Sequence, residues 1–406
     1  MEQDDNRYKR GLRIGLVNGF IVGIALMLIV LLGQNLLLKK EADATGNSKV
    51  EQNISNRMDD VEHKIQTVSK YLDKYYYKEV DEDVLEDGIY YGMAVSLGDK
   101  YTTYYTKEQY EDLLEEDEGA YCGIGVLVSL NKETGQVVVT KVFSKSSAKE
   151  VGVEEGDIFK SIDGEDVSNV SEIEKVADMV RGKEGTTVKI TFVRDGKDVE
   201  LKIPRKSVEV DTVEYEMKEN HIGYIQISEF DGVTSSQLRD AVKDLQKQGM
   251  EKLIVDLRNN PGGRLDSVRN IASAFQAGDD LFLYSQEKDG TRQDYYLEDN
   301  AICTDIPMVI LVNENSASAS EAFTGAMKCY KRATVVGTTT FGKGIMQSLF
   351  ELSDGSALKI TIGKYYLPDG NNIHEVGITP DVEVKNETEG EDTQLAKAME
   401  VVAGLK

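Results

Sequence analysis

Residues 313–347 read N-E-N-S-A-S-A-S-E-A-F-T-G-A-M-K-C-Y-K-R-A-T-V-V-G-T-T-T-F-G-K-G-I-M-Q, and we expect the chain to be organised around this segment. An apolar run, Met308 to Val312, leads into three serines spaced by alanines. Apolar residues then recur at helical spacing: Ala322, Phe323, Ala326 and Met327. The pattern predicts a strand, a tight turn and a helix. A serine in that turn would lie at a helix N-terminus, where unpaired N–H groups and the helix dipole favour a developing negative oxygen.

A second strand, predicted at Ala333 to Val336, leads to a lysine between two glycines, Gly342-Lys343-Gly344. A serine nucleophile with Lys343 as its general base is therefore our leading interpretation. The alternative is a phosphate-binding loop, because Gly337 to Lys343 matches the first seven positions of G-x-x-x-x-G-K-[ST]. Gly344 stands where a Ser or Thr hydroxyl should hold magnesium, which disfavours a nucleotide site.

The composition of the chain limits the kinds of function that it can have. A chain of 406 residues with 40% hydrophobic content can build two or three domains. The net charge of −25, without a basic stripe, argues against a nucleic-acid partner. Three cysteines without a CxxC pair, Cys122, Cys303 and Cys329, support neither a disulfide framework nor a zinc site. We expect no metal and no cofactor.

The N-terminal region predicts a membrane anchor. Residues 14–38 carry no charge and would span roughly 37 Å as a helix at 1.5 Å per residue. Basic residues precede this run within the short tail 1–13, which places that tail in the cytoplasm. A cleaved signal peptide is the alternative, because Ala42-Asp43-Ala44 has a small-x-small form. We favour an uncleaved, single-pass anchor in the cell membrane, with the remainder outside the cytoplasm.

Residues 39–118 read as a helical region. Apolar residues recur at steps of four and three: Ile54, Met58, Val61, Ile65, Val68, Leu72 and Tyr75. Such a stripe requires a partner helix, either within the same chain or across a dimer interface. Together with the predicted C-terminal helix, it suggests a homodimer. A second helix is expected at about 81–97.

Residues 119–206 change to short strands and glycine turns, with one helix near 170–180. Their order resembles a PDZ domain. In that family the loop that corresponds to Gly123, Ile124 and Gly125 offers backbone N–H groups to the terminal carboxylate of a peptide. The strand that begins at Val126 would accept the peptide as an added strand.

Residues 207–385 alternate strands with helices, which indicates an α/β fold with a largely parallel sheet. Strands are expected at 222–227, 253–257 and 308–312, and helices at about 235–247 and 265–277. Between them lies R-N-N-P-G-G-R, Arg258 to Arg264, where proline and two glycines free backbone N–H groups. Residues 386–406 form an acidic linker and a terminal helix.

Three motifs occur together: S-A-S-A-S-E, V-V-G-T-T-T-F-G-K-G-I-M-Q and D-L-R-N-N-P-G-G. In this combination the chain resembles the carboxyl-terminal processing peptidases over about residues 70–385. The resemblance implies a multidomain α/β protein with a crotonase/Clp-protease-like spiral core and an inserted PDZ domain. It also implies Ser318 as nucleophile, Lys343 as base and Gln347 as the residue that orients the lysine.

The resemblance further implies an oxyanion hole. The N–H of Ala319 would supply one donor, and Gly262 or Gly263 the other; the sequence leaves open which glycine donates. Substrates would be proteins or peptides with accessible, apolar C-termini. At the end of the PDZ helix, Arg181 is our candidate for relaying peptide binding to the protease core.

Lys343 can act as a base only if it is desolvated. A lysine with a solution pKa near 10.4 takes a serine proton at neutral pH only when burial lowers that pKa by roughly two to four units. We expect the side chains of Thr338, Phe341 and Ile345 to surround the lysine and shield it from water. Ser316 and Ser320 are expected to be neighbours of the nucleophile, with Ser320 capping the helix.

Two further alternatives stay open at this point. His374 could serve as the base of a Ser-His triad, although a loop histidine of ordinary surroundings explains it better. The chain could also be a catalytically silent PDZ adaptor at the membrane, although every expected catalytic position is filled. Replacement of Ser318 by alanine separates an enzyme from an adaptor.

Overall fold

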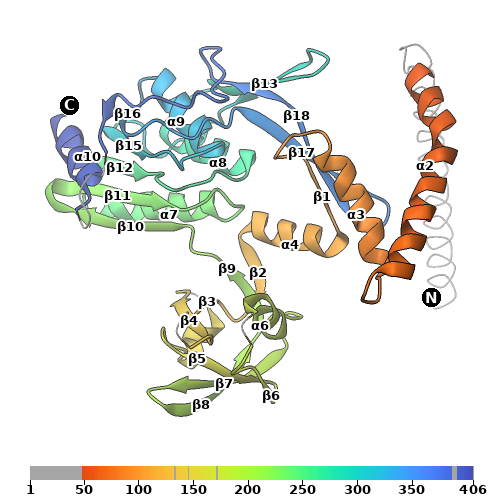
Figure 1. The fold of residues 1–406 in the computed structure, drawn as a ribbon. Coiled ribbons are helices and arrows are strands. Elements are labelled where there is room, and N and C mark those ends of the chain that lie inside the picture. Colours follow the sequence, from red (N-terminus) through yellow and green to blue (C-terminus); the bar gives the residue numbers. More distant parts are fainter. Residues whose placement is uncertain (1–47, 132–133, 145, 171, 386–390, 406) are drawn as a thin grey trace, which may run out of the picture. The chain divides into compact units, whose positions relative to one another are not determined.

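The computed structural model describes residues 48–131, 134–144, 146–170, 172–385 and 391–405 (Figure 1). It divides into two units, Met1–Ile89 and Tyr90–Lys406. The predicted anchor at 14–38 and the tail 1–13 lie outside the described residues. Within the described ranges, no helix combines the length and the apolar character that a bilayer crossing requires.

The described part of the first unit, from residue 48 onward, is mainly helical. Helix α2 (Ser48–Tyr75) runs for 28 residues, and α3 (Glu82–Val95) begins in this unit and ends in the second. The predicted apolar stripe of α2 stays open to solvent where side chains are described: Val61 is 49% exposed and Val68 48%. Helices α2 and α3 confirm the two helices that the sequence predicted in this region, one with the apolar stripe and one at about 81–97.

The core of the second unit is a six-stranded sheet in the order β10-β11-β12-β15-β16-β19. Every neighbouring pair is parallel except β10 with β11, as the sequence predicted for this region. The strands are β10 (Val213–Lys218), β11 (Ile222–Ile227), β12 (Lys252–Asp256), β15 (Met308–Val312), β16 (Thr334–Gly337) and β19 (Val382–Glu383).

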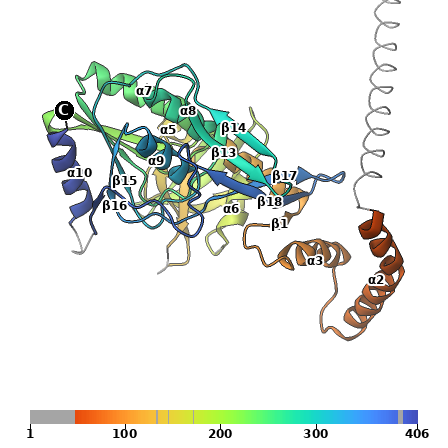
Figure 2. The ribbon, with the colours of Figure 1, turned by 90° about the horizontal axis from the view of Figure 1, so that it is seen from above.

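Helices cover both faces of this sheet (Figure 2). One face is covered by α7 (Thr234–Lys247), α8 (Leu265–Phe275) and α9 (Ala319–Cys329). These helices pack against buried strand residues such as Ile225, Val255 and Ile310. The C-terminal helix α10 (Thr393–Gly404) packs on the other face, where Ala398 and Val402 contact the alternate residues of the strands. The central strands β12 and β15, buried on both faces, are almost continuously apolar.

A second, antiparallel sheet was not predicted from the sequence. Its strands follow the order β1-β18-β13-β14, with β17 also paired to β18. They are β1 (Thr103–Tyr105), β13 (Leu281–Glu287), β14 (Arg292–Tyr296), β17 (Ile345–Glu351) and β18 (Ala357–Tyr366). Because β17 begins at Ile345, the Lys343 loop connects the parallel sheet to the antiparallel one.

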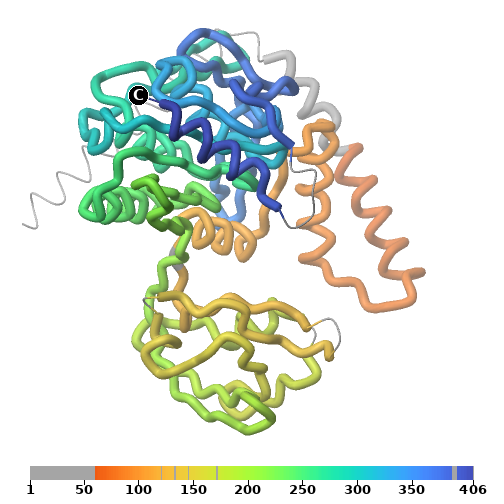
Figure 3. Tube along the Cα trace, turned by 90° about the vertical axis from the view of Figure 1, so that its left-hand side faces the viewer, coloured from red at the N-terminus to blue at the C-terminus, as the bar shows by residue number. Residues whose placement is uncertain are grey.

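The PDZ region is a separate lobe, yellow to light green in Figure 3. It is joined to the core through the paired strands β2 (Ala120–Gly123) and β9 (Lys206–Glu209), next to helix α4 (Lys107–Glu118). Its own core gathers around Phe159, Phe192 and Ile190. Its elements are β3 (Val126–Leu130), β4 (Val137–Val142), α5 (Ser147–Val151), β5 (Ile158–Ile162), β6 (Glu165–Asp166), α6 (Ile173–Val180), β7 (Thr187–Arg194) and β8 (Lys197–Pro204).

Candidate active site

Ser318 is the N-cap of α9, directly after the turn that follows β15. Its backbone has φ 54° and ψ −113°, a region that non-glycine residues rarely adopt and that costs about 1–3 kcal/mol. The buried Tyr365 hydroxyl holds this conformation by donating a hydrogen bond to the Ser318 carbonyl oxygen at 3.1 Å. The predicted strand, turn and helix are present, and the strained residue is the serine that the motif selects.

The neighbouring serines have structural roles. Ser316 Oγ donates to the Leu257 carbonyl at 2.7 Å, and Ser320 Oγ donates to the Asn260 carbonyl at 3.0 Å. Both therefore fasten the turn to the loop after β12. The expectation that Ser320 caps α9 was wrong, because Ser318 occupies the cap and Ser320 lies inside the first turn.

Glu321 is the site residue that the sequence analysis missed. Its side chain is fully buried and accepts hydrogen bonds from the Ser318 and Lys343 backbone N–H groups at 2.9 and 2.8 Å. It also accepts bonds from the Gly342 N–H at 2.7 Å and the Thr340 hydroxyl at 2.6 Å. One carboxyl group thus joins the turn that holds Ser318, between β15 and α9 (the nucleophile turn), to the loop that holds Lys343, between β16 and β17 (the lysine loop). The spacing S-x-x-E, a capping box, was the signal that could have identified it.

The loop Asn259 to Arg264 lies against the nucleophile. A Cβ atom on Gly262 would lie 2.8 Å from the Ser318 Cβ, and one on Gly263 would lie 2.4 Å from the Phe230 carbonyl oxygen. Only glycine fits at either position. The Gly262 N–H donates to Asn260 Oδ1 at 2.8 Å. Among the described residues, the N–H groups of Gly263 and Ala319 have no internal acceptor.

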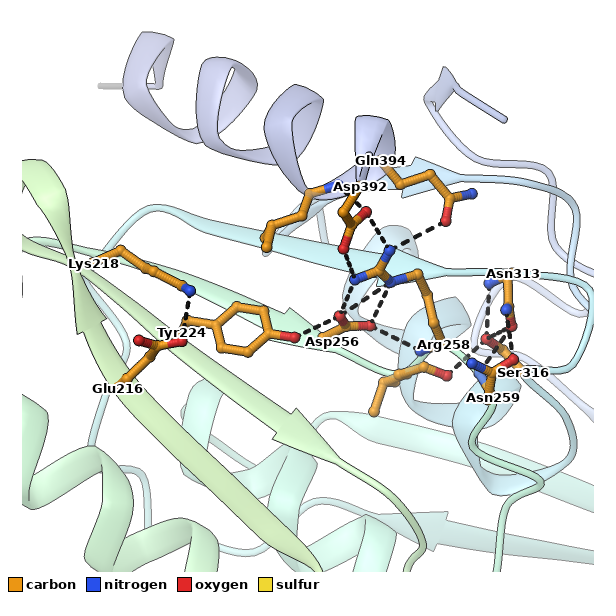
Figure 4. Close-up of polar contacts among 12 residues, drawn as sticks. Glu216, Lys218, Tyr224, Asp256, Arg258, Asn259, Asn313, Ser316, Asp392 and Gln394 are labelled. Atoms are coloured by element: carbon orange, nitrogen blue, oxygen red, sulfur yellow. Dashed lines mark hydrogen bonds and ion pairs between the residues drawn. The ribbon is translucent and has the colours of Figure 1, made fainter. Parts of the chain in front are cut away.

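A polar network fixes the start of this loop (Figure 4). Arg258 pairs with the buried Asp256 at 2.6 Å and with Asp392, the N-cap of α10, at 2.7 Å. The Tyr224 hydroxyl donates to Asp256 at 2.8 Å. These bonds raise the pKa of the Arg258 guanidinium, against the effect of its burial. Beyond it, Asn259 and Asn313 exchange hydrogen bonds at 2.9 and 2.8 Å, which joins the loop to the nucleophile turn.

Lys343 has a lowered pKa, chiefly because burial disfavours its charged form. The positive charges of Lys359 and Lys100 lower it further, and the negative charges of Glu321 and Asp99 oppose them. Its Nζ lies 4.7 Å from the centre of the Tyr101 ring. The chain thus has the desolvated lysine that the proposed chemistry requires.

The prediction of which side chains surround Lys343 was only partly right. Ile345 is buried, but Phe341 is 49% exposed and its ring lies under Lys100, 5.2 Å from that nitrogen. The Thr338 hydroxyl donates to Glu314 at 2.9 Å. Tyr101, far away in sequence, supplies the aromatic cover in their place.

Ser318, Ala319, Gly263 and Gln347 line one cavity of about 240 Å³. Apolar side chains form most of its remaining wall: Leu265, Leu283, Ala322, Ile345 and Met346. The Lys343 side chain is not part of this lining. In the described part of the chain, no hydrogen bond joins Lys343 Nζ to Ser318 Oγ, and the Gln347 amide donates to Thr361 Oγ1 at 3.4 Å. Four of the predicted site residues thus meet at one cavity, while the side chain of Lys343 does not reach the serine.

His374 is not placed as a triad base. Its Nδ1 is buried without a hydrogen-bond partner among the described residues, and no bond connects it to Ser318. Its charge contributes to the lowered pKa of Asp99, after the Thr102 and Thr361 side chains and the Tyr101 backbone. The alternative mechanism has no geometric support.

A second cavity, of about 280 Å³, lies in the PDZ lobe between β3 and α6. Of the predicted peptide-binding loop, Gly123, Ile124 and Val126 line it and Gly125 does not; the apolar residues Phe143, Phe159, Val176 and Val180 also line it. Gly125 has φ 83°, and a Cβ there would lie 2.2 Å from the Ser146 Cβ. This position admits only glycine.

Arg181 lies at the end of this groove and contacts two elements that lead to the core. Its guanidinium pairs with Asp112 of α4 at 3.6 Å and lies 5.8 Å from the ring centre of Tyr121 in β2. Burial, partly offset by the charge of Arg181, raises the pKa of Tyr121 to about 12. The sequence placed Arg181 at the helix end, and the structure adds both partners.

Comparison with known families gives three matches. Peptidase family S41 matches residues 221–384, the PDZ domain matches residues 123–204, and the N-terminal domain of the activating protease CtpB matches residues 20–109. The predicted PDZ domain and α/β protease core are thereby confirmed.

Two curated relatives are similar to this chain. A probable CtpA-like serine protease of Staphylococcus aureus is 39% identical over 85% of this chain and 67% of its own length. A similarly described protein of Staphylococcus haemolyticus is 39% identical over 79% of this chain and 64% of its own. The chain thus spans about two thirds of these relatives. The structure of the photosystem II D1 C-terminal processing protease is 26% identical, with a TM-score of 0.47, over 83% of this chain and 90% of its own.

Proposed function

Because the chain belongs to peptidase family S41, among the CtpA-like serine proteases, we propose that it is a membrane-anchored carboxyl-terminal processing endopeptidase. The family assignment confirms the predicted class, a serine endopeptidase. The more specific proposal rests on the strained Ser318 at the cavity wall, beside two backbone N–H groups that have no acceptor among the residues that the structure describes.

In the proposed reaction, Ser318 Oγ attacks the carbonyl carbon of the scissile peptide bond while Lys343 Nζ takes the hydroxyl proton. The negative oxygen is stabilised by the N–H groups of Ala319 and Gly263. Gly263 is our choice between the two glycines, because the Gly262 N–H already donates to Asn260. Lys343 then returns the proton to the leaving amine, and water hydrolyses the acyl-enzyme.

The same proposal assigns Gln347 to the lysine. A neutral amide can accept a hydrogen bond from the lysine amine without stabilising its charged form, as a carboxylate would. For this contact, the Gln347 side chain has to leave Thr361 and Lys343 has to approach the cavity. Substrate binding is the event that would bring both about.

The PDZ groove supports a preference for substrates with apolar C-termini. Its lining is mainly apolar, and the loop from Gly123 to Val126 lies at the groove, where it can receive a terminal carboxylate. Arg181 would relay binding, because a peptide carboxylate in the groove competes with Asp112 for its guanidinium. The exchange would loosen one contact between the PDZ lobe and α4.

Membrane anchoring and dimerisation remain part of the proposal. Residues 14–38 would anchor the chain, with its catalytic part outside the cytoplasm. The exposed apolar stripe of α2 supports pairing through the helical region, because such a stripe is stabilised by a partner helix. Sedimentation of the full-length chain in detergent tests this, and a monomer at all concentrations would contradict it.

Digestion of casein tests the catalytic assignment. Ser318→Ala and Lys343→Ala are expected to abolish cleavage, whereas His374→Ala should keep it within a few fold. Cleavage by Ser318→Ala would contradict the proposed function. Loss of cleavage in His374→Ala with activity retained in Lys343→Ala would replace the dyad by a triad.

A further inference from the structure

Tyr101 is the aromatic residue that covers the withdrawn Lys343. The lysine Nζ lies 4.7 Å from the centre of the Tyr101 ring, within the range in which the face of an aromatic ring attracts a cation. This contact brings together two segments that lie more than half the chain apart in sequence. Neither the motifs nor the proposed reaction assigns Tyr101 a role.

The backbone around Tyr101 is fastened to the antiparallel sheet. The Tyr101 N–H donates to Asp99 Oδ1 at 3.0 Å, and the Thr102 hydroxyl donates to Asp99 Oδ2 at 2.6 Å. The Thr361 N–H of β18 donates to Thr102 Oγ1 at 3.1 Å. Since β1 begins at Thr103, two residues after Tyr101, and pairs with β18, the backbone that carries the ring is held beside the lysine.

The contact competes with catalysis. A lysine that acts as the base has to reach Ser318 Oγ in its neutral form. Here the Lys343 side chain lies outside the cavity lining to which both Ser318 and Gln347 belong. Its interaction with the ring is with the ammonium, so it favours the protonated, withdrawn lysine over the reactive one.

We propose that Tyr101 is a positioning residue that holds Lys343 as an ammonium in a resting position, away from Ser318. This inference rests on the proposed function, in which Lys343 is the base. Activation then requires the lysine to leave the ring, and the strength of this contact sets how often the dyad forms without substrate.

The charged groups around Lys343 do not replace this role. Lys359 and Lys100 disfavour the ammonium, and Asp99 and Glu321 favour it, while His374 faces Asp99. Tyr101 itself has two opposite effects: its bulk excludes water, which favours the neutral amine, and its π face favours the ammonium. Substitutions can separate the two.

The experiment measures kcat/KM for labelled casein across pH, with the full-length chain and three variants. The acid limb of this profile reports the pKa of the catalytic base in the free enzyme. Tyr101→Leu keeps the apolar cover and removes the π face, so cleavage at neutral pH should rise roughly two- to fivefold and the acid limb should move to lower pH. Tyr101→Ala admits water, so its acid limb should move to higher pH. Tyr101→Phe keeps both effects and should retain the wild-type profile.

Tyr77→Leu is the matched control, because it removes a similar contact, with Lys78 Nζ 5.2 Å from the centre of an exposed tyrosine ring, and neither side chain is among those that shift the pKa of Lys343. Its acid limb should not move. The inference is overturned if Tyr101→Leu leaves the profile unchanged or moves it to higher pH, as a merely structural role would. If Ser318→Ala still cleaves casein, the proposed function fails instead, so the two failures are distinguishable.

Discussion

At the residue scale, Glu321 connects the two halves of the site. Its carboxyl group receives donors from the nucleophile turn and from the lysine loop, and the Thr340 hydroxyl can donate to it because that oxygen accepts its own bond from the Ile378 N–H at 2.7 Å. All partners of Glu321 are hydrogen-bond donors. If an amide NH₂ group replaced one carboxylate oxygen, it would face other donors and could not accept their hydrogen bonds.

We therefore expect Glu321→Gln to reduce kcat by at least about tenfold and the free energy of unfolding by about 2–4 kcal/mol, because two buried donors lose their acceptor. Casein cleavage and urea unfolding measure the two effects. Glu314→Gln is the control: this exposed glutamate accepts a hydroxyl bond from Thr338 in the same region and should change either quantity little. Equal behaviour of the two variants would remove Glu321 from the site.

Residue-scale chemistry was predictable where it depends on short motifs. The motifs predicted Ser318, Lys343, Gln347 and the glycines after Pro261 as site residues, and the structure places Ser318, Gln347 and Gly263 at one cavity with Lys343 outside its lining. The sequence could not locate Tyr101 over Lys343, because that contact depends on the pairing of β1 with β18. Nor could it show that the Gly262 N–H is already bonded, since this depends on the orientation of Asn260.

At the scale of elements, the parallel sheet was predictable and the antiparallel one was not. Strands β12 and β15 are buried on both faces and read as continuous apolar runs, which single them out in the sequence. Strands β17 and β18 are mostly half-buried, so they carry polar and charged residues such as Gln347, Lys359 and Lys364. Such strands take their stability from cross-strand pairs, which the sequence does not display.

The loop between β11 and α7 is a further element of the site. Its Phe230 N–H donates to the Gly262 carbonyl at 2.9 Å, and its Gly232 N–H donates to the Asp117 carbonyl at 3.0 Å. It therefore joins the glycine turn to the end of α4. It also carries Asp231, which is 7% exposed and whose pKa is raised to about 7 by burial and by the charges of Glu229 and Asp117.

This raised pKa makes stability depend on pH. Asp231 stays protonated in the folded chain up to about pH 7 but ionises near pH 4 when unfolded, so stability falls as pH rises through this window. We expect Asp231→Asn to stabilise the chain by about 2 kcal/mol at pH 8 and by nothing at pH 4, measured by urea unfolding. Asp240→Asn, at an exposed site on α7, should show no such difference. An equal effect of Asp231→Asn at both pH values would contradict the titration.

At the scale of the whole molecule, the proposed relay would carry the effect of peptide binding from a separate lobe to the protease core. Strands β2 and β9 provide the covalent connection. Arg181 adds a contact that a peptide can change, because its guanidinium lines the groove and also pairs with Asp112. Both side chains are well exposed, so the pair contributes less than about 1 kcal/mol to stability. A weak pair is easily exchanged for a peptide carboxylate.

This exchange predicts opposite effects for its two partners. Asp112→Asn frees Arg181, so peptides with apolar C-termini should bind the groove more tightly and stimulate cleavage at lower concentration, by roughly two- to fivefold. Arg181→Ala should bind them more weakly and lose the stimulation while it keeps unstimulated cleavage. Fluorescence anisotropy of a labelled peptide and casein cleavage with added peptide measure both. Lys175→Ala, an exposed change on the same helix, controls for loss of positive charge. If Arg181→Ala is stimulated as strongly as wild type, peptide binding reaches the protease core through β2 and β9 alone.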